Sequence, residues 1–295
     1  MRFGITPIEV ENITRVFEEK KGLDSFLNFR ISDIILEAIE RGYEHCEITL
    51  DLFQVLPIQV NHEEIDRLKS LKKEYDITYS AHFPIWSIEL ASPNKIIRTA
   101  SIQSSIEAFN LFKPLEPDIE VFVLHPTGAF IAELMKMDIK PRYKQIILDL
   151  IVTYSTNSIK EIIKKTKINP SKIAIENVEF PFERTLEIVN KIKNVKLCID
   201  TAHFLGGFSG DYDIVEIAKN HLDITSEIHL QDYSAIVGAD HGPLGPNFPV
   251  EFLKIINKRN FEGPIVFELT FEQAFESIEF IKTNLSEIHV PKIKK

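Results

Sequence analysis

The stretch "LCIDTAHFLGG", residues 197–207, belongs to an apolar run that starts at Val195 and is typical of a buried strand. The run breaks at Asp200, and Thr201 and His203 follow before two glycines. An acid and an imidazole at the end of a core strand are costly to bury unless another group pairs with them. The stretch therefore predicts a strand that ends at a site where partners for Asp200 and His203 are present.

The same pattern recurs along the chain, because short β-branched or apolar runs alternate with amphipathic helical patterns. One helix is predicted to start at Asn61, and another at Ser92–Pro93, with Ile96, Ile97 and Ala100 as the buried stripe of the second. The strand candidates are Arg2–Thr6, Cys46–Leu50, Ile77–His82, Glu120–His125, Lys172–Glu176, Val195–Asp200, Ser226–Leu230 and Pro264–Leu269.

Alternating strands and helices predict an α/β protein with a parallel sheet. Eight such units within 295 residues predict a (β/α)8 TIM barrel, a parallel eight-stranded barrel with outer helices. A doubly wound open sheet is the alternative, but its glycine-rich phosphate turn does not follow the first strand. Because no Ser-, Gly- or Pro-rich linker divides the chain, we expect one domain over residues 1–295.

Composition narrows the classes of function. A net charge of −10 argues against an extended nucleic-acid surface, and no apolar run is long enough to cross a bilayer. The N-terminal residues do not resemble a secretory signal, so we expect a cytoplasmic protein. Cys46 and Cys198 are expected to be small buried hydrophobes. The basic tail, residues 290–295, is expected to be solvated.

Polar side chains cluster at the ends of the predicted strands, which is where the active site of a TIM barrel lies. A single histidine or glutamate at a strand end is more often structural, but acids and histidines at six consecutive strand ends converge on one rim. These residues, with those that follow within a turn, are His82, His125, Glu176, Asp200, His203, His229, Asp240, His241 and Glu268.

Carboxylates that face one another repel, and a bound divalent cation resolves this because carboxylate oxygens and imidazole nitrogens are its natural ligands. Asp200 and His203 are therefore interpreted as metal ligands. Mixed nitrogen and oxygen ligands without thiolate suit Mn, Zn or Co better than Ca.

The motifs "SAHFP", "HPTG", "IEN", "CIDTAH", "HLQD", "DHGPLG" and "FEL", in this order, resemble those of the xylose-isomerase-like TIM barrels. The resemblance extends from about Cys46 to Phe280. That superfamily includes sugar isomerases and epimerases and the endonuclease IV enzymes, also called AP endonuclease family 2. The resemblance implies a TIM barrel with a divalent metal.

In the sugar branch, the resemblance implies one metal (Mn, Zn, Co or Mg) held by Glu176, Asp200, His229 and Glu268. Glu176 and Glu268 would also move the proton of a carbohydrate substrate beside a metal-polarised carbonyl. His82, His125 and His203 would bind hydroxyls or a phosphate, and Phe83 and Trp86 would form an apolar wall against the sugar. Core packing is the alternative for the two aromatic residues.

In the nuclease branch, the resemblance implies three zinc ions and a DNA partner, with His82, His125, His203 and His241 as additional ligands. The remaining ligand of that branch, an aspartate, would occupy position 239, where this chain has Ala239 beside Asp240. The residues after the third and seventh strands and the loop after the fifth also depart from the nuclease pattern. Basic inserts that would enter a duplex are not evident.

Two further segments are candidates for substrate contact. Residues 127–144 are long for a connection in such a barrel, so they form either a lid or an irregular insertion. Its basic residues, the candidates for a substrate phosphate, are Lys136, Lys140, Arg142 and Lys144, although a solvated helix face is the simpler interpretation. Glu179, Glu183 and Arg184 are weaker candidates for substrate contact.

The sequence thus favours a metal-dependent isomerase or epimerase of a small sugar, sugar phosphate or polyol. The first alternative is a zinc-dependent AP endonuclease. The second is a barrel that binds a metal or sugar without catalysis.

Overall fold

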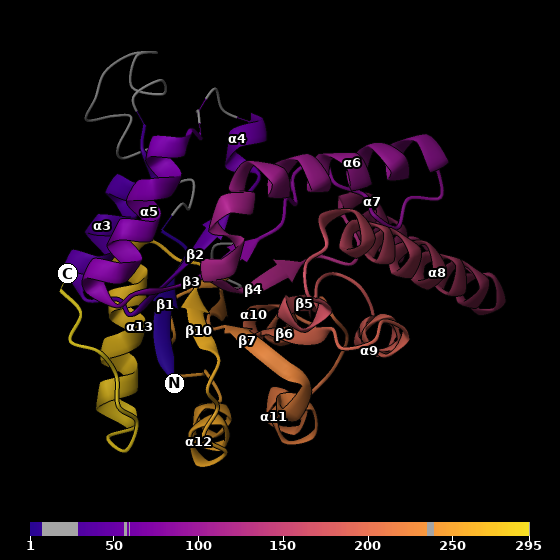
Figure 1. The fold of residues 1–295 in the computed structure, drawn as a ribbon. Helices are drawn as coiled ribbons and strands as arrows, with labels where there is room; N and C mark the ends of the chain where they lie inside the picture. The colour runs from indigo at the N-terminus through magenta and orange to yellow at the C-terminus, as the bar shows by residue number, and fades with distance from the viewer. Residues whose placement is uncertain (8–28, 56–57, 59, 235–238, 295) are drawn as a thin grey trace.

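Eight parallel strands form a closed barrel with helices around it, which confirms the predicted fold class (Figure 1). The strand order around the barrel is β1-β10-β7-β6-β5-β4-β3-β2, and β1 pairs with β2 to close it. The structure is a computed structural model that describes residues 1–7, 29–55, 58, 60–234 and 239–294.

The eight barrel strands fall within one or two residues of the predicted runs. They are β1 (Arg2–Ile5), β2 (His45–Thr49), β3 (Thr78–His82), β4 (Ile119–Leu124), β5 (Ile173–Glu176), β6 (Lys196–Asp200), β7 (Thr225–His229) and β10 (Pro264–Phe267). Between the last two strands lies an antiparallel pair that the sequence did not predict, β8 (Asp232–Ser234) and β9 (Ala239–Gly242).

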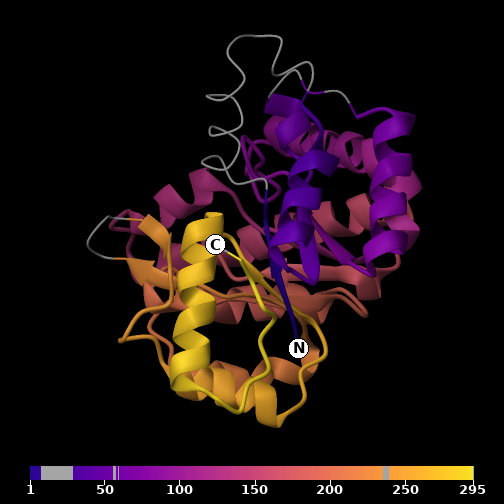
Figure 2. The same ribbon diagram turned by 90° about the vertical axis from the view of Figure 1, so that its left-hand side faces the viewer.

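The described helices follow the strands, and the longer ones lie around the outside of the barrel (Figures 1 and 2). They are α3 (Ile31–Arg41), α4 (Leu52–Val55), α5 (His62–Tyr75), α6 (Lys95–Phe112), α7 (Ala129–Lys136), α8 (Pro141–Thr166), α9 (Phe182–Lys191), α10 (Thr201–Leu205), α11 (Ile214–His221), α12 (Val250–Lys258) and α13 (Phe271–Asn284). None of these described helices combines the length and apolar character needed to cross a membrane.

Register relates the polar residues at the strand ends. Asp200 at the end of β6 pairs with His229 at the end of β7, and Glu176 at the end of β5 pairs with Cys198 of β6. Because alternate residues of a strand face the same side, Cys198 and Asp200 both face the barrel interior. The carboxyl ends of β5, β6, β7 and β10 therefore bring their polar side chains to one rim.

The barrel interior is apolar on one side and polar on the other. Its apolar part is a small cluster separate from the main core, made of Val121, Val123, Ala174 and Cys198. The polar part contains His45, whose ring contacts the Thr78 and Ser80 hydroxyls. Gly4 is needed here because a Cβ would lie 2.8 Å from His45 atoms.

Two expectations outside the barrel interior are wrong. Helix α6 begins after Asn94, not Ser92, because the Asn94 side chain accepts the Ile96 N–H. The predicted buried stripe is exposed: 80% of Ile96 is accessible, and the helix buries the face that carries Ile102 and Phe109 instead. The C-terminal tail is not fully solvated, since Ile293 is buried and Lys294 donates its N–H to the Arg41 carbonyl of α3.

Candidate metal centre

Four side chains from consecutive barrel strands converge at the carboxyl end of the barrel. Glu176, Asp200, His229 and Glu268 offer ligand atoms that all lie within 4.8 Å of one another. The first three are almost fully buried, whereas the Glu268 side chain is 12% exposed and lines a cavity. Glu176 also lines this cavity, so two carboxylates of the site border a substrate-sized space, and that of Glu268 is the more exposed.

Local hydrogen bonds fix Asp200, which begins helix α10 as its N-cap. Its Oδ1 accepts the His203 N–H at 2.8 Å, and its Oδ2 accepts a hydrogen bond from Gln231 Nε2 at 2.6 Å. The same Gln231 amide donates to Glu268 Oε2 at 3.0 Å. Asn177 exchanges hydrogen bonds with the Asp200 backbone. The acid at the strand end is thus paired by capping and by amide donors, and it keeps its place at the rim.

His229 is fully buried, and neither of its ring nitrogens has a hydrogen-bond partner among the described residues. Its Nδ1 lies 3.2 Å from Glu268 Oε2 and 3.4 Å from Glu176 Oε1. A buried imidazole without hydrogen bonds, facing two carboxylates, has the donor set that a divalent cation such as Mn, Zn or Co prefers. The residues present therefore fit a metal.

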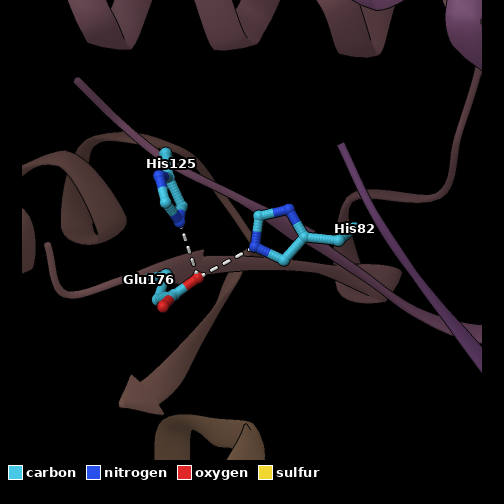
Figure 3. Close-up of side chains that lie close together, drawn as sticks. All are labelled: His82, His125 and Glu176. Carbon is cyan, nitrogen blue, oxygen red and sulfur yellow. Dashed lines mark hydrogen bonds and ion pairs between the residues drawn. The ribbon is translucent and has the colours of Figure 1, made fainter. Parts of the chain in front are cut away.

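A second group lies beside the first, where His82 and His125 approach the same oxygen of Glu176 (Figure 3). Their Nε2 atoms lie 3.1 Å and 3.0 Å from Glu176 Oε2. His82 Nδ1 is 2.8 Å from the Phe83 carbonyl oxygen, to which it donates. This bond directs Nε2 of His82 towards the site, and these three residues form a possible metal-binding group.

A third group consists of Asp200, His203 and His241. His203 Nδ1 lies 2.7 Å from the Asn177 carbonyl oxygen, and the His203 and His241 rings are 5.8 Å apart. His241 lies on β9, and its Nε2 is 3.8 Å from Glu268 Oε2. The side chain of Asp240 lies outside the described part of the structure.

Protons on histidines balance the carboxylates in the absence of a metal. Burial lowers the pKa of His82, but the Glu176 hydrogen bond and nearby carboxylates outweigh it and raise the pKa to about 10. At His203, burial likewise lowers the pKa, but the carboxylates of Asp200 and Glu176 outweigh it and raise the pKa to about 9.

The carboxylates respond in opposite directions. Burial raises the pKa of Glu176, but the neighbouring His125 and His229 outweigh it and hold the pKa well below its ordinary value. At Asp200, burial outweighs His203 and His241, so its pKa is raised. A divalent cation would replace the protons on the histidines, so we expect its binding to release protons.

A cavity of about 470 Å³ adjoins the candidate ligands and is bordered by Glu176 and Glu268. Its volume is within the size range of small-molecule sites. Trp86, 48% exposed, lines this cavity with Ile85 and Val178. The polar lining residues include Asp51, His82, His125, Thr127, Glu133, Lys136, Glu176, Glu179, His203, His241 and Glu268.

Helix α7 and its preceding loop line this cavity. Residues 127–144 contain α7 and the start of α8, so they are not an irregular loop throughout. Glu89, from the loop after β3, joins the two segments because its Oε1 accepts the Phe130 N–H at the start of α7 at 2.5 Å. Gly128 allows this approach, since a Cβ there would collide with the Ile88 carbonyl oxygen. This hydrogen bond connects the loop that carries Trp86 to helix α7, which also lines the cavity.

Most of the basic residues that the sequence suggested for substrate contact do not line this cavity. Lys136 lines the cavity, but its ammonium is paired with Glu133 at 2.7 Å. Lys144 lines a neighbouring cavity with Glu179 and Glu183. Arg184 is paired with Asp149 and Glu187. Lys140 and Arg142 are not among the residues that line either cavity.

Phe83 is not at the cavity. It is 1% exposed and packs against Phe122, with 5.9 Å between the ring centres. Because His82 faces the barrel interior, the next residue faces the helices. Five further residues contact the site and were not singled out as functional from the sequence: Cys198 and the polar residues Glu47, Asn177, Glu227 and Gln231. Glu227 precedes His229 by two residues on the same strand, and this spacing indicates that both side chains face the barrel interior.

Comparisons with known proteins agree with this architecture. A family model described as a xylose isomerase-like TIM barrel matches residues 35–284. A search of curated proteins finds no significant match. A solved D-tagatose 3-epimerase-like protein is similar to this chain, with a TM-score of 0.65, 20% identity, and coverage of 97% of this chain and 98% of the other.

Two more solved structures are similar over most of their length. D-allulose 3-epimerase from Methylomonas sp., solved in complex with D-allulose, has a TM-score of 0.61 and 15% identity, with 96% of both chains covered. Endonuclease IV from Thermus thermophilus has a TM-score of 0.64 and 14% identity, with 98% of this chain and 100% of the other covered. At such low identities these likenesses establish the fold alone. Since the family model covers most of the chain, the protein belongs to the xylose isomerase-like TIM barrel family.

Proposed function

We propose that the protein is a divalent-metal-dependent isomerase or epimerase that acts on a small, unphosphorylated sugar or polyol. The convergence of Glu176, Asp200 and Glu268 on the unpartnered imidazole of His229 carries this proposal. The similar epimerase structures support it as relatives of the same fold.

The four residues would hold one metal, with Mn, Zn, Co or Mg as candidates. When bound, the metal would polarise a carbonyl or hydroxyl of the substrate and so acidify the neighbouring carbon. Glu176 and Glu268 would then take and return the proton of that carbon through a carboxylate oxygen. Glu268 is the better placed to reach substrate because its side chain is partly exposed to the cavity.

The charges of the cavity favour a substrate without phosphate. Besides Glu176 and Glu268, its lining carries the carboxyl groups of Asp51, Glu133 and Glu179, whereas Lys136 is the one lysine or arginine among its described residues. Lys136 is already paired with Glu133. The start of α7, which opens onto the cavity, is occupied by the Glu89 carboxylate. A dianionic phosphate would meet repulsion from these carboxylates, with the histidines of the lining as the main compensating groups.

The exposed Trp86 ring offers an apolar surface for the carbon-bound hydrogens of a sugar. Around it, His82, His125 and His203 supply nitrogens that can exchange hydrogen bonds with sugar hydroxyls. These contacts are roles that we propose for the lining, and they require no charged group on the substrate.

A matched panel of free ketoses, polyols and their phosphate esters tests this proposal. Protein loaded in turn with Mn, Co, Zn and Mg is incubated with each compound in deuterated water, and NMR follows deuterium uptake at carbon. We expect exchange with at least one free sugar and much weaker exchange with its phosphate ester. Equal or faster turnover of the ester would contradict the charge argument, and no exchange across the panel would contradict the proposed reaction.

A zinc-dependent AP endonuclease is the second candidate, because two further metal-binding groups adjoin the first. One contains His82 and His125, and the other contains His203 and His241. Elemental analysis of protein purified without tag or chelator tests this alternative, together with cleavage of duplex DNA that contains an abasic site. Two or three zinc ions per chain with cleavage would favour the nuclease, whereas one metal without cleavage would favour the sugar enzyme.

A further inference from the structure

Beneath the four candidate ligands, the barrel interior contains two further carboxyl groups, those of Glu47 on β2 and Glu227 on β7. Both residues are fully buried. One oxygen of each is held by a hydroxyl: Thr6 Oγ1 donates to Glu47 Oε1 at 3.0 Å, and Ser80 Oγ donates to Glu227 Oε1 at 2.8 Å. The Oε2 atom of each has no hydrogen-bond partner among the described residues. Such atoms are costly to bury, so their position calls for a donor.

The side of His229 that faces away from the candidate metal ligands offers a donor, its Nε2. While Nδ1 faces Glu176 and Glu268, Nε2 lies 3.5 Å from Glu47 Oε2 and 3.9 Å from Glu227 Oε1. The shorter distance is somewhat longer than the ~2.9 Å of a typical N–H···O bond, and a small ring movement would close it. His229 thus sits between the candidate metal centre and the Glu47 carboxyl.

Histidine ligands usually donate their second ring N–H to a carbonyl or carboxylate, which fixes the tautomer and the ring orientation. His82 and His203 have such a partner, because Nδ1 of each lies against a backbone carbonyl oxygen. His229 has no carbonyl contact of this kind among the described residues, and the Glu47 carboxyl occupies the corresponding position.

We propose that Glu47 is the positioning residue of His229: its Oε2 accepts the Nε2–H and so keeps the Nδ1 lone pair directed between Glu176 and Glu268. This inference rests on the proposed metal centre and extends it to a residue that does not itself reach the substrate. Glu227 is more distant from the same Nε2, and its nearer oxygen is already bonded to Ser80.

A purely structural role for Glu47 makes a different prediction. In a purely structural role, loss of the hydrogen bond from Thr6 and of the buried carboxylate would lower the free energy of unfolding and leave metal affinity unchanged. A positioning role predicts instead that metal affinity falls while the metal-free protein stays folded. Affinity for the metal, measured apart from catalysis, therefore separates the two roles.

The test compares the wild-type chain with Glu47→Ala and Glu47→Gln. The matched control is Glu64→Gln, since Glu64 is also a buried carboxyl but is bonded to Ser32, outside the site. Each protein is stripped of metal and titrated with Zn²⁺ against a competing chelator, and with Co²⁺ while its visible absorption is recorded.

We expect Glu47→Ala to weaken the metal Kd by about 10- to 100-fold, with altered Co²⁺ bands. Glu47→Gln should weaken it several-fold, because a neutral amide oxygen still accepts the bond, and Glu64→Gln should leave affinity unchanged. If Glu47→Ala does not fold, Glu47→Gln decides. Wild-type affinity and spectrum in the Glu47 variants would overturn this inference alone, whereas absence of metal binding in the wild type would overturn the proposed function.

Discussion

Replacing Glu268 with glutamine changes the site's chemistry while preserving its shape. The side-chain oxygen that accepts the Gln231 amide at 3.0 Å can be kept, and the backbone N–H of residue 268 still donates to Gln231 Oε1. What is lost is the negative charge of one of three carboxylates around His229, including the charge on the oxygen 3.2 Å from its Nδ1. The change therefore acts on charge and proton transfer and hardly on packing.

The expected loss of activity follows from these two functions. A positioned general acid or base typically contributes about 10²- to 10⁴-fold to a rate, so we expect Glu268→Gln to lower kcat by about 10³-fold, or about 4 kcal/mol of barrier. Loss of one buried charge-assisted contact should change the free energy of unfolding by about 1–3 kcal/mol. For a chain of this size that is a shift in Tm of a few degrees, by calorimetry.

The assay is deuterium uptake at carbon on the best sugar of the panel, with metal content measured in the same samples. Glu133→Gln is the control, since Glu133 also lines the cavity but is exposed and paired with Lys136. That variant should retain most activity. Exchange by metal-loaded Glu268→Gln at close to the wild-type rate would refute the acid/base role of Glu268.

Three other predictions concern the metal-free protein and the cavity. Because the folded-state pKa values of His82 and His203 are raised to about 10 and about 9, their stabilisation is fully present below about pH 6.5 and lost as the pH rises through those values; the Tm of metal-free protein should therefore fall from pH 7 to pH 10, and a rising Tm would contradict this. Trp86→Ala should raise KM for the free sugar by about 10-fold with little change in Tm, because the residue is about half exposed. An unchanged KM in steady-state kinetics would contradict this prediction. Glu133→Lys should improve turnover of phosphate esters relative to free sugars if cavity charge sets selectivity, and an unchanged ratio of kcat/KM would argue against it.

Much of the fold and of the rim could be predicted because both depend on local patterns. Strands with apolar interiors and polar ends are recognisable in a barrel sequence, and the strand-end rule places Glu176, Asp200 and His229 at one rim without any distance information. The residues that brace the rim were harder to find. Glu47 and Gln231 act through neighbours on other strands, and only the closed register brings them together.

The two wrong predictions about helix α6 share a physical cause: its residues form contacts other than the ones that their local sequence pattern indicates. Ser92 is a good cap candidate, but it is buried and its hydroxyl accepts the Asn94 N–H ahead of the helix, so Asn94 begins the helix. The stripe that begins at Ile96 has helical spacing, yet the face with Ile102 packs inward. Periodicity detects an apolar face but does not state which of two faces meets the barrel.

The fastening between Glu89 and the start of α7 has a consequence for how new specificities arise on this scaffold. The segment with Trp86 and the segment with Gly128 meet through a carboxylate on one side and an absent side chain on the other. Transplanting either segment alone from a relative would leave the half-buried Glu89 carboxylate without the Phe130 N–H or drive a Cβ into a backbone carbonyl. The two segments should therefore be inherited, and engineered, as a single cassette.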